Sequence, residues 1–414
     1  RGKQPGIPGD VGQDVEDAAV KPGESCRLFG AYRACIGIRD AVILFHSVVG
    51  CNAGTLLLHL AQHPADVRQA CTVMYESDVL YGGTETLRDG LQHAAELYPD
   101  PQAIIVISGC VPNLIGDDMA AAIADAGLAV PVLMGAGTVG TMGDGYEAGL
   151  LALGAHMCPG EIVPRSCNIL GISYDDPCAE GDIAALREML APHVRVQSVL
   201  SCGTFEEMRD APRAALNIVL GGGGRELAAY MQEQFGTPYI VADYPYGIHG
   251  MTAFIERVAD ALGIAETDAW TAPFVRAAEE IVRRAAEPLR YLYGTPAAVL
   301  VDAVHRAGLC TFLAEELGME VALSSDGRGD MREVYDAVRA SDAVVIFGSS
   351  YEKELCADEG RVLVRICYPV FDRLQLVPHG YLGAEGLAHL IEEIVSAVLQ
   401  HEYSPTEYGE VRVR

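Results

Sequence analysis

The 414-residue chain is poor in basic residues, with 29 Lys and Arg against 57 Asp and Glu and a formal net charge of -28. Nucleic-acid binding depends on clustered Lys and Arg that neutralise phosphates. The deficit therefore argues against a nucleic-acid partner. The acidity favours solubility and could steer a positively charged partner surface, but it carries no information about the fold.

Long hydrophobic segments are also absent. No run reaches the roughly 18 apolar residues that a transmembrane helix needs, so no membrane span is predicted. Residues 1–17 are rich in Gly, Pro and Asp and lack the apolar centre of a signal peptide. We therefore expect a cytoplasmic protein whose thiols stay reduced, in which metal binding is a better use for cysteine than disulfide formation.

The twelve cysteines include no C-x-x-C pair, the spacing typical of many zinc and redox sites. Three of them nevertheless follow apolar, strand-like or turn-prone runs. Cys51 follows the run at 41–45, Cys110 follows the run at 103–107, and Cys26 follows a short polar turn. Open α/β sheets bind ligands at the carboxyl ends of their strands, so these thiolates could converge on one iron–sulfur centre.

Two considerations weigh against that hypothesis. Most buried cysteines act only as small apolar side chains. Three ligands also leave a cubane cluster one short, so a second chain would have to contribute. The other nine cysteines are expected to be core or surface thiols, with Cys71 the nearest because it lies between the candidate ligands in the sequence.

Strand-like and helical segments alternate along the chain, which is too long for a single core. Apolar runs typical of buried strands occupy residues 41–45, 103–107, 130–134, 168–172, 194–199, 215–220, 297–301, 342–347 and 362–366. Helical spacing is found at 55–62, 84–97, 117–126, 182–190, 225–235, 269–293, 306–317 and 386–400. Repeated strand–helix units predict an α/β fold with parallel sheets.

The alternation falls into three units of similar build, which predicts three Rossmann-like domains. We expect a cluster-binding domain at residues 24–163 and further αβ domains at 164–293 and 294–400. An N-terminal arm, 1–23, precedes them, and a C-terminal tail, 401–414, follows.

Residues 221–224 form a run of four glycines between a predicted strand and a helix. Such a turn could cradle a phosphate. The spacing matches neither G-x-G-x-x-G nor a P-loop. Close packing at the start of a helix is the better explanation.

Polar residues also lie beside the candidate ligands. His46 is expected to be a packed, hydrogen-bonded histidine, and Ser108 to cap the following helix or to bond to cluster sulfur. Asp117 and Asp118 would complement the dipole of a helix start.

Four sequence blocks carry a resemblance to a known family. They are ESCRLFGA (24–31), HSVVGC (46–51), VLYGG (79–83) and SGCVPNLIGDD (108–118). In this order they resemble the signature blocks of nitrogenase component 1. Further blocks at 216–219, 244–248, 365–373 and 383–386 extend the resemblance over about residues 24–400. It implies the α/β fold of nitrogenase component 1.

The Phe-Asp-Arg sequence at 371–373 resembles the β-type subunit of that family. The α-type subunit holds a catalytic cofactor with a cysteine after the strand that corresponds to 216–219, where this chain has Leu220 and Gly221. The resemblance implies that Cys26, Cys51 and Cys110 bind a double-cubane [8Fe-7S] P-cluster shared with an α-type subunit, or a [4Fe-4S] cluster in its place. Apolar neighbours such as Val48, Val49 and Val111 would exclude water.

The resemblance also implies partners and an activity. The chain would pair with an α-type subunit in an α2β2 heterotetramer, with an FeMo-co-like cluster in the partner and no catalytic residue here. An ATP-dependent [4Fe-4S] reductase homodimer would pass electrons to the shared cluster. Within the family we favour methylthio-alkane reductase, an oxidoreductase that cleaves C–S bonds of small thioethers. The alternatives are the β subunit of a nitrogenase proper, a tetrapyrrole-reducing relative and a scaffold for cofactor assembly.

Overall fold

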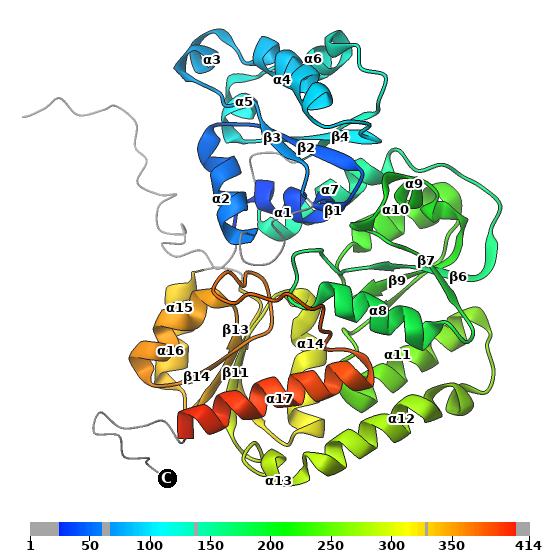
Figure 1. Ribbon diagram of the computed structural model, residues 1–414, viewed down its shortest axis with the longest axis vertical. Coiled ribbons are helices and arrows are strands. Elements are labelled where there is room, and N and C mark those ends of the chain that lie inside the picture. Colours follow the sequence, from blue (N-terminus) through cyan, green and yellow to red (C-terminus); the bar gives the residue numbers. More distant parts are fainter. Residues whose placement is uncertain (1–24, 60–66, 136–139, 328–329, 403–414) are drawn as a thin grey trace, which may run out of the picture.

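The computed structural model describes residues 25–59, 67–135, 140–327 and 330–402 (Figure 1). The predicted arm, 1–23, and the tail beyond residue 402 lie outside the described residues. Within them the strands form three four-stranded parallel sheets and one two-stranded parallel sheet. The predicted α/β fold with parallel sheets is confirmed, and the domain boundaries remain a prediction.

The first sheet is buried on both faces. Its strands in spatial order are β3 (Gln69–Cys71), β2 (Ala41–His46), β4 (Ala103–Ser108) and β5 (Val132–Gly135). Every residue of β2 and β4 is buried, which explains their nearly continuous apolar sequence. Figure 1 shows helices on both sides: α4 (Thr84–Leu97) and α6 (Met119–Ala126) cover one face, and α1 (Arg27–Cys35) and α7 (Met142–Gly154) cover the other.

The other two four-stranded sheets follow the same plan. The second contains β10 (Tyr239–Ala242), β9 (Ala214–Leu220), β6 (Val163–Leu170) and β7 (Arg195–Val199). The third contains β12 (Glu320–Ser325), β11 (Pro296–Leu300), β13 (Val345–Gly348) and β14 (Val362–Arg365). A two-stranded sheet of β1 (Gly37–Ile38) and β8 (Cys202–Gly203) connects the first unit to the second.

Each four-stranded sheet contains one point where the strand order reverses. In the first sheet the chain leaves β2 for β3 on one side and then crosses to β4 on the other. The corresponding points lie between β6 and β9 in the second sheet and between β11 and β13 in the third. Open α/β sheets bind their ligands outside the carboxyl ends of the strands at these points.

Most helices predicted from spacing are present, with shifted ends in most cases. The single helix expected at 269–293 is wrong, because the helix there ends at Arg284 and only a short helix, Ala286–Leu289, follows it. Residues 60–62 of the helix expected at 55–62 lie outside the described residues. The helix expected at 84–97 is α4, with the same bounds. The other helices are α2 (Val49–His59), α3 (Glu76–Tyr81), α5 (Cys110–Ile115), α8 (Ala179–Leu190), α9 (Phe205–Arg209), α10 (Arg225–Phe235), α11 (Gly247–Leu262), α12 (Thr267–Arg284), α13 (Ala286–Leu289), α14 (Ala303–Thr311), α15 (Met331–Ala340), α16 (Lys353–Glu359) and α17 (Gly383–Glu402). In the described part of the chain, none is both long enough and apolar enough to span a bilayer.

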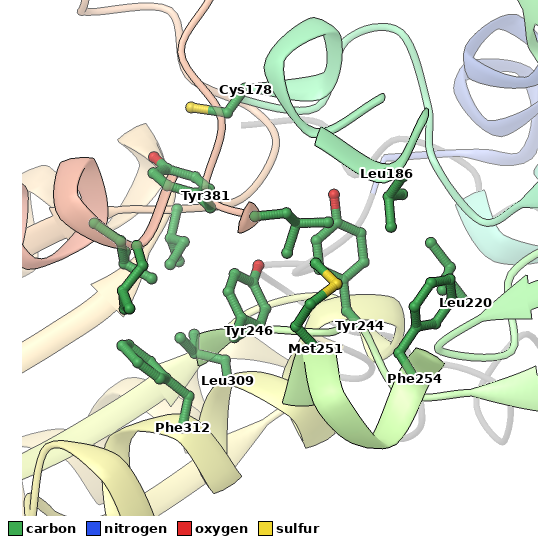
Figure 2. Close-up of a cluster of buried hydrophobic side chains, with 14 of the residues drawn as sticks. Cys178, Leu186, Leu220, Tyr244, Tyr246, Met251, Phe254, Leu309, Phe312 and Tyr381 are labelled. Atoms are coloured by element: carbon green, nitrogen blue, oxygen red, sulfur yellow. The ribbon is translucent and has the colours of Figure 1, made fainter. Parts of the chain in front are cut away.

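One hydrophobic core spans the second and third sheets. Figure 2 shows Tyr244 and Tyr246, which follow β10, beside Leu309 of α14 and Phe312 of the π-helical segment Phe312–Glu316 that continues it. The Tyr244 hydroxyl donates a 2.6 Å hydrogen bond to Asp182 of α8, so its polar end is satisfied. The second and third sheets are therefore held together by apolar packing rather than by a flexible linker.

Buried charges join α1 to loops of the second and third units. Arg33 of α1 donates from Nε to Asp175 at 2.9 Å and from Nη2 to Asp176, both in the loop after β6. Towards the third unit, the Arg33 guanidinium lies 4.2 Å from the centre of the Tyr368 ring, which follows β14. Within that unit, His305 of α14 lies 3.0 Å from both carboxylate oxygens of Asp302, in the loop after β11. Buried charges are tolerated only when they are paired in this way, so these contacts fix where the three units meet.

Candidate functional site

Two of the predicted ligands lie at the point of strand reversal in the first sheet. Cys51 is in the first turn of α2, which follows β2, and Cys110 is the first residue of α5, which follows β4. Because β2 and β4 are neighbours with paired ends, His46 opposite Ser108, the two cysteines emerge from adjacent strands. The expectation that they lie at the carboxyl ends of parallel strands is confirmed.

The loops that carry Cys51 and Cys110 are packed directly together. The Gly109 amide donates to the carbonyl of His46 at 2.9 Å. A Cβ atom on Gly109 would lie only 2.7 Å from the Cβ of Ser47, so a larger residue would push the loops apart. Gly50 has a different role: it is an ordinary helical residue with open space on its Cβ side. Of the two glycines that directly precede these cysteines, only Gly109 is therefore required to be glycine by close packing.

Cys26 is placed by a close contact between two helices. It precedes α1 and forms an isolated antiparallel bridge with Thr141, which precedes α7. A Cβ atom on Gly30 would overlap the Met142 carbonyl, and one on Gly145 would overlap the Arg27 carbonyl. The backbones of α1 and α7 are therefore in direct contact, and this contact fixes the position of Cys26 at the start of α1.

The thiols of the other candidate ligands act on the ionisation of Cys51. Burial raises the pKa of the Cys51 thiol, and the nearby thiols of Cys26, Cys110 and Cys71 raise it further. A hydrogen bond with Ser47 acts in the opposite direction. Thiolates gathered in one place repel each other, and a cationic metal centre relieves that repulsion while deprotonating its ligands.

The arrangement does not suit a single metal ion. Over the described ranges, no three His, Cys, Asp or Glu side chains come close enough together to hold one ion. A multi-iron cluster takes its cysteines on different iron atoms, so its ligands are more widely spaced than those of one ion. Cys26 and Cys110 are exposed and Cys51 is half-buried, so all three thiols are accessible to a bulky group. The site fits an iron–sulfur cluster better than a mononuclear metal.

His46 is a structural residue, as predicted. It is fully buried, with Nδ1 3.1 Å from the Thr72 hydroxyl and Nε2 3.3 Å from Asp117. Burial lowers the pKa of His46 and the hydrogen bond with Asp117 only partly offsets this, so the ring is neutral near pH 7. Asp117 also accepts a 2.7 Å hydrogen bond from the amide of Gly83. Asp117 thus links the end of β2 to the start of α4. Asp118 lies at the start of α6, as expected, and caps it by accepting a hydrogen bond from the amide of Ala121.

The prediction for Ser108 was wrong in detail. Ser108 is buried and accepts a 2.9 Å hydrogen bond from the side chain of Asn113 within α5. The same Asn113 nitrogen donates to the carbonyl of Gly109 at 2.8 Å. Gly109, rather than Ser108, is the residue that precedes α5. Ser108 therefore supports the position of Cys110 through Asn113 instead of capping the helix.

Cys71 contacts Ser47, which belongs to the loop leading to Cys51, and its thiol also acts on the pKa of Cys51. It ends β3, and its sulfur is 4.0 Å from the Ser47 hydroxyl and accepts from the amide of Val73 at 3.4 Å. Val73 has a positive φ of 54°, which is strained for a β-branched residue. The chain thus turns tightly around this sulfur. The only sequence signal for this placement was its position between Cys51 and Cys110.

The four-glycine turn does not offer a phosphate site. Glu147 of α7 accepts from the amide of Gly224 at 2.7 Å and from that of Glu226 at 3.1 Å. Its carboxylate therefore occupies the start of α10, where a phosphate would bind. The interpretation of this run as helix-start packing agrees with the structure.

Comparison with known proteins identifies the family from the sequence and a matching fold among solved structures. The family model described as nitrogenase component 1 type oxidoreductase matches residues 26–399. The chain is 25% identical to the nitrogenase iron-molybdenum cofactor biosynthesis protein NifE of Nostoc sp., over 95% of this chain and 85% of that protein. It is 23% identical to the nitrogenase molybdenum-iron protein beta chain of Methanococcus maripaludis, over 94% of this chain and 96% of that protein.

A solved structure described as nitrogenase Cp1 at pH 6.5 superposes with a TM-score of 0.79, at 18% identity, covering 96% of this chain and 97% of that chain. At this identity the superposition is evidence for the fold alone. The family model spans nearly all of the described residues and includes all three candidate cysteines. The chain belongs to the nitrogenase component 1 type oxidoreductases.

Proposed function

We propose that this chain is the β-type subunit of a nitrogenase-like reductase. In this proposal Cys26, Cys51 and Cys110 bind half of an [8Fe-7S] P-cluster, and an α-type subunit supplies the remaining ligands. The observation that carries the proposal is that Cys51 and Cys110 follow adjacent strands at the strand reversal of the first sheet, with the Cys26 thiol near enough to raise the pKa of Cys51. A three-cysteine set suits a cluster shared across a subunit interface because neither chain then completes the ligand set alone.

The surface around the cysteines supports a partner at this place. Large apolar side chains are exposed there: Leu80 is 75% exposed, Tyr81 88% and Leu114 79%. Val49, beside Cys51, is 56% exposed, so it does not exclude water within this chain alone. Clustered exposed apolar residues are typical of protein interfaces. An α-type subunit that covers this surface would bury these side chains and exclude water from the cluster.

This chain has no room for a cysteine at position 221, which corresponds to the cysteine that holds the catalytic cofactor in the α-type subunit. Gly221, directly after β9, has a positive φ of 55°, and a Cβ atom there would overlap the Val304 carbonyl. No cysteine side chain fits at 221 without moving α14. This supports placing the catalytic cofactor in the partner, with this chain acting as an electron relay between an ATP-dependent [4Fe-4S] reductase and that cofactor.

Within the relay, the cluster supplies one-electron redox chemistry when it is bound. This chain's residues hold it and control its surroundings. Ser47 contributes a hydrogen bond at Cys51, and the tight β2–α2 and β4–α5 loops fix two of the ligands. Hydrogen bonds to ligand sulfur and exclusion of water set the potential of such clusters.

A second candidate function is a scaffold on which a cofactor is assembled. It is favoured by the similarity to cofactor biosynthesis proteins, including one from Clostridium pasteurianum at 28% identity over 80% of this chain. A scaffold would use the same cysteines and would release its cluster cargo instead of turning over substrate. Site geometry in this chain is compatible with both functions.

For substrate, we propose a small thioether, with methylthio-alkane reductase as the activity. Two electrons and two protons would convert R–S–CH3 into R–H and methanethiol. The test is to purify the chain anaerobically with its partner, add the reductase, ATP and ethyl methyl sulfide, and measure ethane and methanethiol by gas chromatography. We expect thiol release without ammonia from dinitrogen. Ammonia would identify a nitrogenase, and the absence of both products from an intact complex would favour the scaffold.

A further inference from the structure

Two of the candidate ligands are carried by helices that lie against each other. Cys26 directly precedes α1, and Cys51 is the third residue of α2. The helices approach closely where Gly54 of α2 faces Phe29 of α1, because a Cβ atom on Gly54 would lie 3.2 Å from the end of the Phe29 ring. The spacing between these two ligands therefore depends on what holds α1 against α2.

The side chain of Gln69, the first residue of the edge strand β3, bridges the two helices. Its Oε1 accepts a 2.7 Å hydrogen bond from the Tyr32 hydroxyl of α1. Its Nε2 donates to Asn52 Oδ1 at 2.5 Å and to the Thr55 hydroxyl at 3.2 Å, both on α2. Tyr32 and Thr55 are buried, and Asn52 directly follows Cys51 in the chain. One side-chain amide thus connects the helix that begins after Cys26 to the helix that contains Cys51.

The backbone of Gln69 is held on both sides. On one side it pairs with Ile43 of the buried strand β2. On the other side its amide donates to the Tyr98 hydroxyl at 3.1 Å, and that hydroxyl donates to the Gln69 carbonyl at 2.7 Å. Edge strands usually leave these backbone groups without a protein partner. The bridging side chain therefore extends from a fixed point of the sheet.

A second residue of β3 supports the same ligand. Cys71 lies two residues after Gln69 and so faces the same side of the sheet. Its thiol donates to the Ser47 carbonyl at 3.7 Å, and the Met74 amide donates to the same carbonyl at 3.0 Å. Ser47 is in the loop that leads to Cys51. The strand thus holds α2 through Gln69 and the loop before α2 through Cys71.

We propose that Gln69 is a positioning residue for the cluster, which sets the spacing between the Cys26 and Cys51 ligands by joining α1 to α2. A side-chain amide suits this task because it accepts on one side and donates on the other. Metal ligands keep their geometry only when the residues behind them are themselves held in place. The inference rests on the proposed function only in that these cysteines bind a cluster, so it applies to a relay and to a scaffold alike.

The test is the rate at which the anaerobically purified complex loses iron to bathophenanthroline disulfonate, a chelator of ferrous iron. Gln69→Leu keeps a side chain of similar size and removes the amide that joins Tyr32 to Asn52 and Thr55. We expect it to release iron roughly tenfold faster than the wild type and to change the electron paramagnetic resonance line shape of the cluster. Gln69→Glu should restore slow release, because its carboxylate accepts from both hydroxyls and the Asn52 amide can turn to donate to it.

Gln197→Leu is the matched control. Gln197 is half-buried on β7, an edge strand of the second sheet, and its side-chain amide donates to the Asp210 carbonyl at 2.9 Å. The same change of residue there removes a comparable hydrogen bond away from both ligand helices, so iron release should match the wild type. Thermal denaturation of each variant separates loss of the bridge from loss of the fold.

Three results would overturn the proposal. They are wild-type iron release from folded Gln69→Leu complex, equal acceleration in Gln197→Leu, and release from Gln69→Glu as fast as from Gln69→Leu. A wild-type complex that contains no iron is a different result, because it would contradict the proposed function itself and this inference with it.

Discussion

Cys51→Ala is expected to abolish reductase-dependent turnover and to remove most of the iron from the anaerobically purified complex. Cys51 interacts electrostatically with both of the other candidate ligands and lies in the first turn of α2. Its loss would leave one part of the cluster without its thiolate in this chain. Substitution of a residue that only hydrogen-bonds to a metal ligand costs roughly 10–100-fold in metal affinity or activity, so removal of a ligand itself should exceed that range. Iron analysis and the electron paramagnetic resonance signal of the cluster give readouts independent of activity.

The matched control is Cys158→Ala. Cys158 is also an exposed, free thiol, but its sulfur contacts only the carbonyl of His156 in the described chain and is not among the groups that act on Cys51. Iron content and turnover should match the wild type in that variant. Full iron and full turnover in Cys51→Ala would show that the thiol cluster is not the relay.

Leu80→Asp is expected to weaken assembly with the α-type subunit by about 100-fold or more. Leu80 lies on α3 and is 75% exposed, so the substitution costs this chain little. In the proposed complex the new carboxylate would be buried without a partner, which costs several kcal/mol at an interface. Sedimentation of the mixed subunits, or the fraction of partner that copurifies, measures the effect.

Leu97→Asp provides the control, because Leu97 lies near the amino ends of the strands of the first sheet and the cysteines lie at their carboxyl ends. Leu97 is 65% exposed at the end of α4, shortly before β4 begins, whereas the cysteines follow the ends of β2 and β4. The same change of residue there should leave assembly intact. Equal loss in both variants would indicate a general effect of added charge, and no loss in Leu80→Asp would place the partner on another surface.

The central strands and one edge strand of each four-stranded sheet, β5, β7 and β14, could be predicted from the sequence, but the other edge strand could not. β2, β4, β9 and β13 are fully or almost fully buried, so each shows a continuous apolar run. The missed strands β3, β10 and β12 all lie at sheet edges. β12 alternates between exposed and half-buried residues, and β3 has only three residues. A strand that is covered on only one face does not need a continuous apolar sequence, and that sequence is the signal by which a fully buried strand is predicted.

The candidate site was predictable where its residues follow such central strands, as Cys51 and Cys110 do. Cys26 follows only a short polar turn and no strand, so its candidacy had a weaker basis; its position depends on the contact between α1 and α7, which are separated by more than 100 residues. The bridge formed by Gln69 was not visible in the sequence. Gln69 belongs to β3, one of the missed strands, and only the fold brings it between α1 and α2.

The most direct test of the shared-cluster account is an anomalous difference map collected at the iron absorption edge from crystals of the anaerobically purified complex. We predict iron density at the subunit interface, bonded to the sulfurs of Cys26, Cys51 and Cys110 and to sulfurs of the partner. Iron bonded to other residues, or these three sulfurs in contact with protein atoms only, would contradict the account.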